Sequence, residues 1–351
     1  MNTFRLERAE TVADALRTIA ARDGQTRDGQ TGEVKFVAGG TTLVDLMKLG
    51  VETPTQVIDI NRLPLAGIQR TEDNGLRIGA LARNSDVAHH ADVTNDYPVL
   101  SQALLSGASV QLRNMATTGG NLMQRTRCVY FRDTAMPCNK RDPGSGCAAL
   151  DGFNRNLAIL GTSEHCIASN PSDQNVALTA LEATVQIASS TKGERSVPIG
   201  DFFFLPGDTP ERETVVEPGE LITSVTLPPP QAGAKSTYLK LRDRASYEFA
   251  LASAAVIITT NEGNIEKARI AMGGIATKPW RNRDVEVALE GKPASREHFE
   301  NAARILLSNA KPRHGNQFKL ELARRCLIHA LTLATATGAT DSTGRDGRAE
   351  Q

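Results

Sequence analysis

Four of the five cysteines in this chain crowd into one irregular stretch, and this stretch restricts the fold more than any other feature. Cys128, Cys138 and Cys147 lie within "CVYFRDTAMPCNKRDPGSGC", and Cys166 follows in "GTSEHCIASNPSD". Prolines and glycines separate the cysteines, which is typical of a loop. The sequence therefore first raises the question of which chemistry brings four thiols into one loop.

Four explanations compete for these thiols. Structural zinc sites usually contain a closely spaced cysteine pair, and none is present here. Two disulfides would suit an oxidising compartment, but a chain of 351 residues can bury an adequate core without them. Independent burial of each cysteine is the third alternative. The fourth, an iron–sulfur cluster, accepts thiolates from an irregular loop, and the basic residues that outnumber acidic ones here would offset its negative charge.

The residues favour the iron–sulfur cluster among these alternatives. The fifth cysteine, Cys326, lies in a helical pattern and is most simply a buried small apolar residue.

Two diglycine turns form a second group of candidates. "VAGGTTL" (37–43) stands where a strand should give way to a helix, and "ATTGGNL" (116–122) has the same chemistry. Paired glycines permit positive φ and let backbone N–H groups approach an anion. The first turn matches neither a P-loop nor G-x-G-x-x-G, so it is weak by itself, but the two turns could converge on one pyrophosphate. "NPSD" (170–173) adds the carboxylate of Asp173, which could hold a ribose or a ring N–H, or merely cap the next helix.

Charge and composition exclude several classes of protein. Lysine plus arginine equals aspartate plus glutamate at 40 each, and aromatic residues make up 4% of the chain, so nucleic-acid binding is not expected. No apolar run approaches the roughly 18 residues that span a membrane, and the N-terminus has no secretory pattern. We expect a neutral enzyme or enzyme subunit that leaves the cytoplasm only with a partner.

A chain of this length is expected to form two domains. The triple proline at 228–230 is the best boundary, so we predict domains at 1–228 and 231–335, with the cysteine loop at about 124–168. The pattern predicts a helix after Thr11 and amphipathic helices near 295–308 and 316–334. Residues 336–351 lack apolar anchors and are expected to form a disordered tail.

Four stretches taken together resemble a known family. "KFVAGGTTLVDLMK", "QLRNMATTGGNL", "NPSD" and "RDRASYEFALASAAV" look like the FAD-binding subunit of the xanthine dehydrogenase and molybdenum hydroxylase family, over residues 1 to about 335. The resemblance implies an α+β fold: a two-part FAD-binding domain of the PCMH/vanillyl-alcohol-oxidase type, followed by a smaller α+β domain of the CO dehydrogenase flavoprotein type. Within the family, the cysteine loop most resembles the 4Fe–4S-containing flavin subunit of bacterial periplasmic aldehyde oxidoreductase.

The resemblance also implies which residues form the sites. The residues that would wrap the FAD pyrophosphate are Lys35, Phe36, Val37, Ala38, Gly39, Gly40, Thr41, Thr42 and Leu43, with Thr117, Gly119, Gly120 and Asn121 opposite. Asp173 would hold a polar group of the cofactor, Ile222 would pack near the isoalloxazine, and Lys240 would lie close to the flavin, unless it is a solvated strand residue. The implied ligands of a 4Fe–4S cluster are Cys128, Cys138, Cys147 and Cys166.

By the same resemblance, the chain would pass electrons from 2Fe–2S clusters on a small partner subunit through FAD to an external acceptor. A large partner with the molybdenum cofactor would oxidise the substrate, an aldehyde, so no catalytic residue is expected here and a heterotrimer is the simplest assembly. The complex would be periplasmic if a partner bears a twin-arginine signal, and cytoplasmic otherwise. The alternatives are a non-enzymatic metal-stabilised scaffold protein, a flavin subunit of the hydroxybenzoyl-CoA reductase type, and a self-sufficient flavin oxidoreductase.

Overall fold

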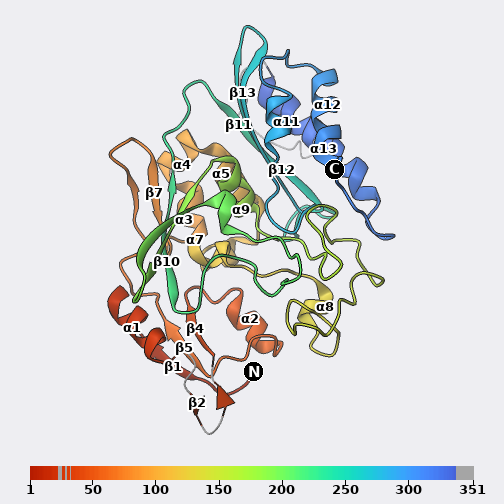
Figure 1. Cartoon of the computed structure of the whole chain (residues 1–351). Coiled ribbons are helices and arrows are strands. Elements are labelled where there is room, and N and C mark those ends of the chain that lie inside the picture. Colours follow the sequence, from red (N-terminus) through yellow and green to blue (C-terminus); the bar gives the residue numbers. More distant parts are fainter. Residues whose placement is uncertain (23–25, 28–29, 32, 337–351) are drawn as a thin grey trace, which may run out of the picture.

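The structure is a computed structural model, and it describes residues 1–22, 26–27, 30–31 and 33–336. Figure 1 shows the N-terminal sheet (red), the central helices (orange to green) and the C-terminal sheet with its helices (cyan to blue). The tail predicted at 336–351 lies outside the described residues, except for Ala336.

A small parallel sheet forms the N-terminal part. Its strands, in spatial order, are β1 (Arg5–Arg8), β5 (Gln56–Asp59) and β4 (Val34–Val37). Two helices accompany it, α1 (Val12–Arg22) and α2 (Leu43–Lys48), and a short ladder joins β2 (Thr26–Arg27) to β3 (Gln30–Thr31). The helix expected after Thr11 is confirmed, because the Thr11 hydroxyl accepts a hydrogen bond from the backbone N–H of Asp14 at 3.0 Å. The apolar face of α1 packs with the strands in one core, formed by Ala15, Leu16, Ile19, Val34 and Ile58 among others.

The second sheet is antiparallel. Its strands, in spatial order, are β6 (Ile68–Arg70), β7 (Leu76–Gly79), β10 (Glu220–Leu227), β8 (Thr184–Ser189) and β9 (Gly193–Pro198). The helices of this central region are α3 (Asn84–His89), α4 (Ala91–Asp96), α5 (Pro98–Ser106), α6 (Val110–Arg113), α7 (Thr118–Leu122), α9 (Asp173–Ala180) and α10 (Ile199–Phe202). Every residue of α9 is buried, so its polar side chains must find partners inside the protein. Gln174 donates to the carbonyl of Thr118 at 3.1 Å, which ties α9 to α7.

The C-terminal part is a three-stranded antiparallel sheet backed by helices. Its elements are β11 (Lys235–Leu241), β12 (Ala252–Asn261), β13 (Asn264–Gly273), α11 (Arg283–Val287), α12 (Arg296–Leu307) and α13 (Phe318–Thr335). The helices α12 and α13 confirm the two amphipathic helices expected there. Central strand β12 is buried on both faces: Ala254 and Val256 belong to the core with α12 and α13, whereas Ala255 and Ile257 belong to the core of the central region. The two parts of the chain therefore pack through this sheet, which explains the unbroken apolar run in β12.

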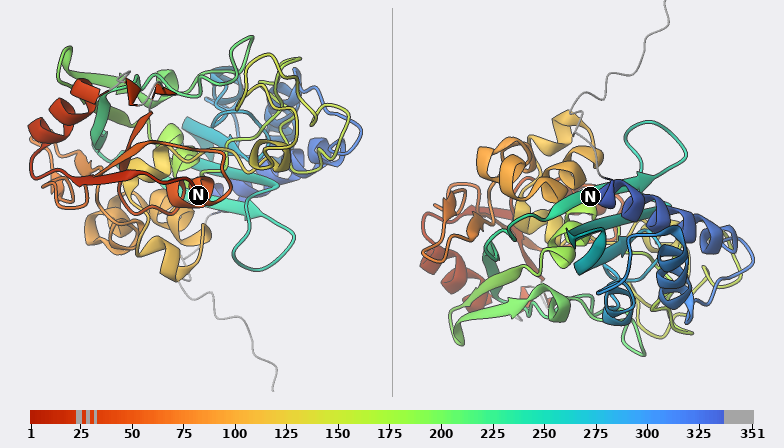
Figure 2. Two further views of the ribbon diagram at one scale, coloured as in Figure 1. Left: turned by 90° about the horizontal axis from the view of Figure 1, so that it is seen from below. Right: turned by 90° about the horizontal axis from the view of Figure 1, so that it is seen from above.

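The cysteine loop has little regular structure. It connects α7 to α9, and α8 (Val129–Arg132) is its only helix. Figure 1 shows it (yellow to olive) near α2, and both views of Figure 2 show it beside the C-terminal helices (blue). The loop therefore lies between α2 and the C-terminal helices.

A buried lysine at the start of α13 fastens the loop to the C-terminal part. The Lys319 ammonium has no exposed surface and donates to the carbonyls of Leu157, at 3.0 Å, and Gly274, at 2.8 Å. Burial lowers the pKa of Lys319 to about 7. The charge of Arg155 lowers this pKa further, and among the described residues no carboxylate pairs with the ammonium to offset these effects.

This lysine should give the protein a pH-dependent stability. In the unfolded chain its pKa returns to about 10.4, so above pH 7 the unfolded state binds more protons than the folded state. The free energy of unfolding should therefore rise between pH 7 and pH 9, by at most about 2.7 kcal/mol from this group. Urea unfolding at pH 7, 8 and 9 measures the slope, which Lys319→Met should flatten and the exposed control Lys311→Met should keep. Equal slopes in wild type and Lys319→Met would contradict the prediction.

Candidate functional site

A cleft of about 880 Å³ is lined by both diglycine turns. Its volume is within the range of small-molecule and cofactor sites. Thirteen of the sixteen cofactor-site residues expected from the sequence line it: Lys35, Phe36, Val37, Ala38, Gly39, Gly40, Thr41, Thr42, Leu43, Thr117, Gly119, Gly120 and Ile222. Asn121, Asp173 and Lys240 are not among the residues that line the cleft.

The first turn needs its two glycines for different reasons. Gly40 has φ of +71°, a conformation that residues with a side chain rarely adopt. Gly39 lies against the backbone of Met115, where an added Cβ would be only 1.8 Å from the carbonyl oxygen. The first turn therefore packs directly on the residues that lead into the second turn.

The second turn is fixed by its own threonine. The Thr117 hydroxyl accepts a hydrogen bond from the backbone N–H of Gly120 at 3.2 Å and so caps α7. The N–H of Gly119 donates to the carbonyl of Ala80 at 2.8 Å, which holds the turn against the segment after β7. These two hydrogen bonds thus fix the backbone of this turn where it lines the cleft.

Two residues that the sequence analysis missed join the turns. Asn61 donates to the carbonyl of Ala38 at 2.8 Å and accepts from Arg83 at 3.1 Å. Arg83 also donates to the carbonyl of Met115. The only signal available in the sequence was a polar residue directly after the apolar strand "VIDI", which does not identify a partner.

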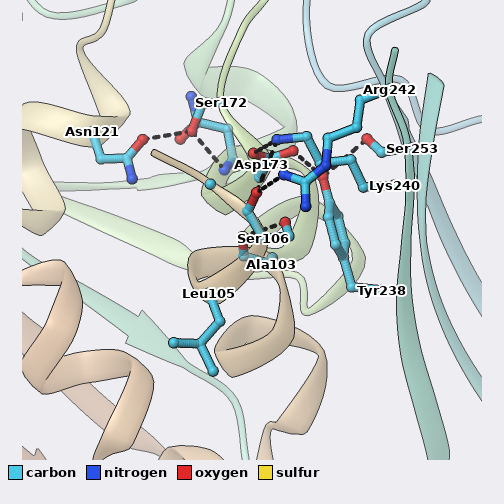
Figure 3. A network of polar contacts seen from close by, with 12 residues as sticks. Ala103, Leu105, Ser106, Asn121, Ser172, Asp173, Tyr238, Lys240, Arg242 and Ser253 are labelled. Atoms are coloured by element: carbon cyan, nitrogen blue, oxygen red, sulfur yellow. Dashed lines mark hydrogen bonds and ion pairs between the residues drawn. The ribbon is translucent and has the colours of Figure 1, made fainter. Parts of the chain in front are cut away.

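Asp173 and Lys240 form a buried ion pair with each other (Figure 3). Their side chains are 9% and 4% exposed, and the Lys240 ammonium lies 2.8 Å from a carboxylate oxygen of Asp173. The cap of α9 is Ser172, whose hydroxyl accepts from the N–H of Asn175 at 3.1 Å. The same hydroxyl donates to the Asn121 side chain at 2.8 Å, so Asn121 connects the second turn to the start of α9.

Tyr238 and Ser106 complete this network in Figure 3. The Tyr238 hydroxyl lies 2.6 Å from the second oxygen of Asp173 and 2.9 Å from the Ser253 hydroxyl. Burial, together with the Asp173 charge, raises the pKa of Tyr238 well above its ordinary value, so the phenol stays protonated and donates. Lys240 also donates to the carbonyl of Ser106 at 3.2 Å. The network joins α5, α9 and the C-terminal sheet in one buried polar cluster.

The four cysteines of the loop meet in three dimensions. Cys128, Cys138, Cys147 and Cys166 line one small cavity and are all free thiols. Cys138 and Cys147 face each other in a short antiparallel bridge. Apolar residues surround the thiols: Leu46, Phe131, Ala149, Leu157, Ile167 and Ala168. The structure thus brings together residues separated by up to 38 positions, and it shows them without disulfides.

Burial makes two of these thiols weak acids. It raises the pKa of Cys128 and of Cys166 to about 11, although nearby Lys140 opposes part of the rise at Cys166. In the part of the chain that the structure describes, no group of three or more His, Cys, Asp or Glu side chains is arranged to hold a metal ion. Metal binding here would require the thiols to release protons and rearrange.

A chain of alternating charges runs from the cleft to the cysteine cavity. Lys35 pairs with Glu52 at 3.3 Å, Glu52 with Arg125 at 2.7 Å, Arg125 with Glu213 at 2.6 Å, and Glu213 with Lys140 at 3.0 Å. All five line the cleft, and Lys140 also lines the cysteine cavity. Burial opposes the charge on Lys35, but Glu52 and the neighbouring Glu33 outweigh that effect and raise the pKa of Lys35. The wall between the two cavities is therefore a continuous chain of ion pairs.

Two families of known domains match the chain in succession. Residues 2–230 match the FAD binding domain in molybdopterin dehydrogenase, and residues 236–334 match the CO dehydrogenase flavoprotein C-terminal domain. The chain belongs to the FAD-binding subunits of the molybdenum hydroxylase family. The family that the sequence motifs resembled is thus confirmed, and an oxidoreductase subunit with an FAD-binding domain is established.

Individual relatives agree with the family. The chain is 51% identical to the aldehyde oxidoreductase FAD-binding subunit PaoB of Escherichia coli, over 96% of this chain and 99% of that protein. It is 31% identical to the glyceraldehyde dehydrogenase medium chain of Sulfolobus acidocaldarius, over 88% and 89% of the two chains.

Solved structures share the fold. A chain of the carbon monoxide dehydrogenase of Hydrogenophaga pseudoflava superimposes with a TM-score of 0.72 at 24% identity, over 95% of this chain and 97% of that one. The expected fold, an FAD-binding domain followed by a CO dehydrogenase flavoprotein domain, is therefore confirmed. Among the described helices, none combines the length and apolarity that a membrane crossing requires.

Proposed function

We propose that this subunit carries FAD and a 4Fe–4S cluster in a molybdenum-dependent aldehyde oxidoreductase, and passes electrons from 2Fe–2S clusters of a partner to an external acceptor. The observation that carries the proposal is that both diglycine turns line one cleft of about 880 Å³. The name of the E. coli relative, an aldehyde oxidoreductase FAD-binding subunit, supports the substrate class.

The cleft residues fit FAD by their chemistry. Gly39 is packed so closely on neighbouring backbone that only glycine suits it, and Gly119 lies in tight contact with Ala80, so that bare backbone can face a ligand at both turns. Residues 35–43 and the second turn would hold the pyrophosphate, with the Lys35 ammonium as a nearby positive charge, and Ile222 would cover the isoalloxazine. When bound, FAD supplies the electron-transfer chemistry of the subunit.

Asn121, Asp173 and Lys240 are proposed to serve the same cofactor. Asn121 belongs to the second turn, and its bond to Ser172 ties that turn to the helix that Asp173 begins. Through this connection the Asp173–Lys240 pair would hold the second turn in position, and it would lie close to the flavin.

The four cysteines fit a 4Fe–4S cluster by their donor set. Four thiols line a single cavity with an apolar shell, and Arg125 stacks over Phe131 of that shell at 4.6 Å. Such clusters are bound by four thiolates, and apolar cover and nearby positive charge adjust their potential. We propose a structural or potential-tuning role for the cluster, with Cys128, Cys138, Cys147 and Cys166 as its ligands.

The partners follow from the same proposal. A large subunit with the molybdenum cofactor and a small subunit with 2Fe–2S clusters would complete a heterotrimer, and a twin-arginine signal on a partner would take the complex to the periplasm. The relative from Sulfolobus acidocaldarius is named a medium chain, which supports an assembly with further subunits.

Chemical analysis of the anaerobically purified chain tests the proposal. We expect stoichiometric FAD, with about four iron and four acid-labile sulfide per chain as a 4Fe–4S cluster requires. Protein without flavin would overturn the FAD assignment. Stoichiometric zinc in place of iron and sulfide would overturn the cluster and favour a zinc-stabilised loop.

Replacing one cysteine should remove the cluster selectively. Cys138→Ser is expected to lose iron and sulfide and to lower the unfolding temperature, because a cluster that binds the native state stabilises it. Cys326→Ser is the matched control, since Cys326 is buried in the C-terminal core and does not line the cavity of the four thiols, and it should keep full iron content. In complex reconstituted with saturating FAD, the rate of flavin reduction should stay at the wild-type value for Cys138→Ser. A slower rate in fully assembled complex would place the cluster on the electron path.

A further inference from the structure

The segment between α10 and β10 contributes much of the cleft wall. We call residues 203–219 the strap; most of them line the cleft. The strap contains Glu213. The carboxylate of this residue pairs with Arg125 and Lys140, which are two cations outside the strap. The strap therefore bounds the proposed FAD site while depending on another part of the chain for its position.

Glu213 fastens the strap through two charged contacts. One oxygen accepts from the Arg125 guanidinium at 2.6 Å, and the other lies 3.0 Å from the Lys140 ammonium. Lys140 also donates to the carbonyl of Pro210 on the strap at 2.8 Å. Burial would raise the pKa of Glu213, but Lys140 and Arg125 outweigh it and hold that pKa below its ordinary value. The carboxylate is thus charged at neutral pH, and its two oxygens are both engaged.

Both partners of Glu213 are attached to the cysteine loop. Lys140 stands two residues after Cys138 and lines the cysteine cavity. Arg125 stacks on Phe131, which is fully buried in the shell of that cavity. A disturbance of the thiol-lined core would therefore move the two cations that hold the strap.

We propose that Glu213 is a positioning residue that couples FAD retention in the cleft to the folded state of the cysteine loop. The inference rests on the proposed function, since it takes FAD as the occupant of the cleft. With the loop in place, its two cations hold the strap against the cleft. When the loop is lost, Glu213 is left as a poorly paired, partly buried charge, and the strap loses its position. FAD then binds more weakly although none of its expected contacts has been changed.

Titration of FAD into the flavin-depleted full chain, followed by flavin fluorescence, tests the role of Glu213. Glu213→Gln should raise the FAD dissociation constant about tenfold, a typical coupling between two sites, and leave iron content unchanged. Asp208→Asn is the matched control: it removes the same charge from the same strap, but its side chain is 96% exposed and lies 3.4 Å from His165. The control should bind FAD as tightly as wild type. Lys140→Met should repeat the effect from the loop side, and it provides the test if Glu213→Gln does not fold.

A double-mutant cycle with Cys138→Ser tests the coupling itself. Cys138→Ser should weaken FAD binding in the wild-type background and have little further effect in Glu213→Gln, because the first change has already broken the connection. Additive effects, or wild-type affinity in both Glu213→Gln and Lys140→Met, would overturn the inference and leave the proposed function intact. Failure of the wild-type chain to bind FAD at all would instead overturn the proposed function.

Discussion

Replacing Gly39 by alanine should abolish FAD retention. The new methyl group would stand 1.8 Å from the carbonyl oxygen of Met115, far inside van der Waals contact, and the obstructing atom is backbone that cannot rotate away. The two turns would have to separate, and Arg83 and Asn61 resist this because they bind both of them. Overpacking of this kind costs about 1–3 kcal/mol or more, and here the cost falls on the geometry of the cleft.

The measurement is the FAD content of purified Gly39→Ala and its dissociation constant by fluorescence titration. We expect the dissociation constant to rise at least tenfold, because about 1.4 kcal/mol already corresponds to a tenfold change in affinity, and we expect FAD to be lost during purification as a result. Gly200→Ala is the matched control, since Gly200 has no heavy atom within 4 Å of an added Cβ. It should keep wild-type FAD content. Tight binding by a folded Gly39→Ala protein would mean that the apposed turns are not the FAD site.

Replacing Lys240 by methionine should destabilise the protein severely. The change leaves the Asp173 carboxylate buried with the Tyr238 hydroxyl but without its countercharge, and the carbonyl of Ser106 loses a donor. Breaking one side of a buried ion pair costs about 3–5 kcal/mol. Because the pair joins α9 to β11, the loss should appear as a lower free energy of unfolding of the whole chain.

Urea unfolding followed by circular dichroism measures this loss. Lys235→Met, on the same strand, removes an identical charge from an exposed position and should change the free energy of unfolding by less than about 0.5 kcal/mol. The same two variants also examine the proposed proximity of Lys240 to the flavin. A variant that keeps wild-type stability but alters the flavin absorption spectrum would assign Lys240 to the cofactor and not to the framework.

Local sequence patterns were sufficient for the main elements of the fold. Helices α12 and α13 follow from apolar residues at helical spacing, and α1 follows from the threonine that begins it, because such signals act over one or two turns. The run of β12 shows no alternation between polar and apolar residues, since both faces of this strand are buried.

The same distinction between local sequence patterns and tertiary packing applies to the candidate site. The sequence by itself determined that two diglycine turns and four thiols are present, because glycine and cysteine carry chemistry that no other residue supplies. Only the tertiary structure decided that Gly39 packs on Met115. It also decided that Asp173 pairs with Lys240, and that Glu213 connects the cleft wall to the cysteine loop. Charged and polar side chains accept many partners, and which of them is within reach is fixed only when segments far apart in the chain come together.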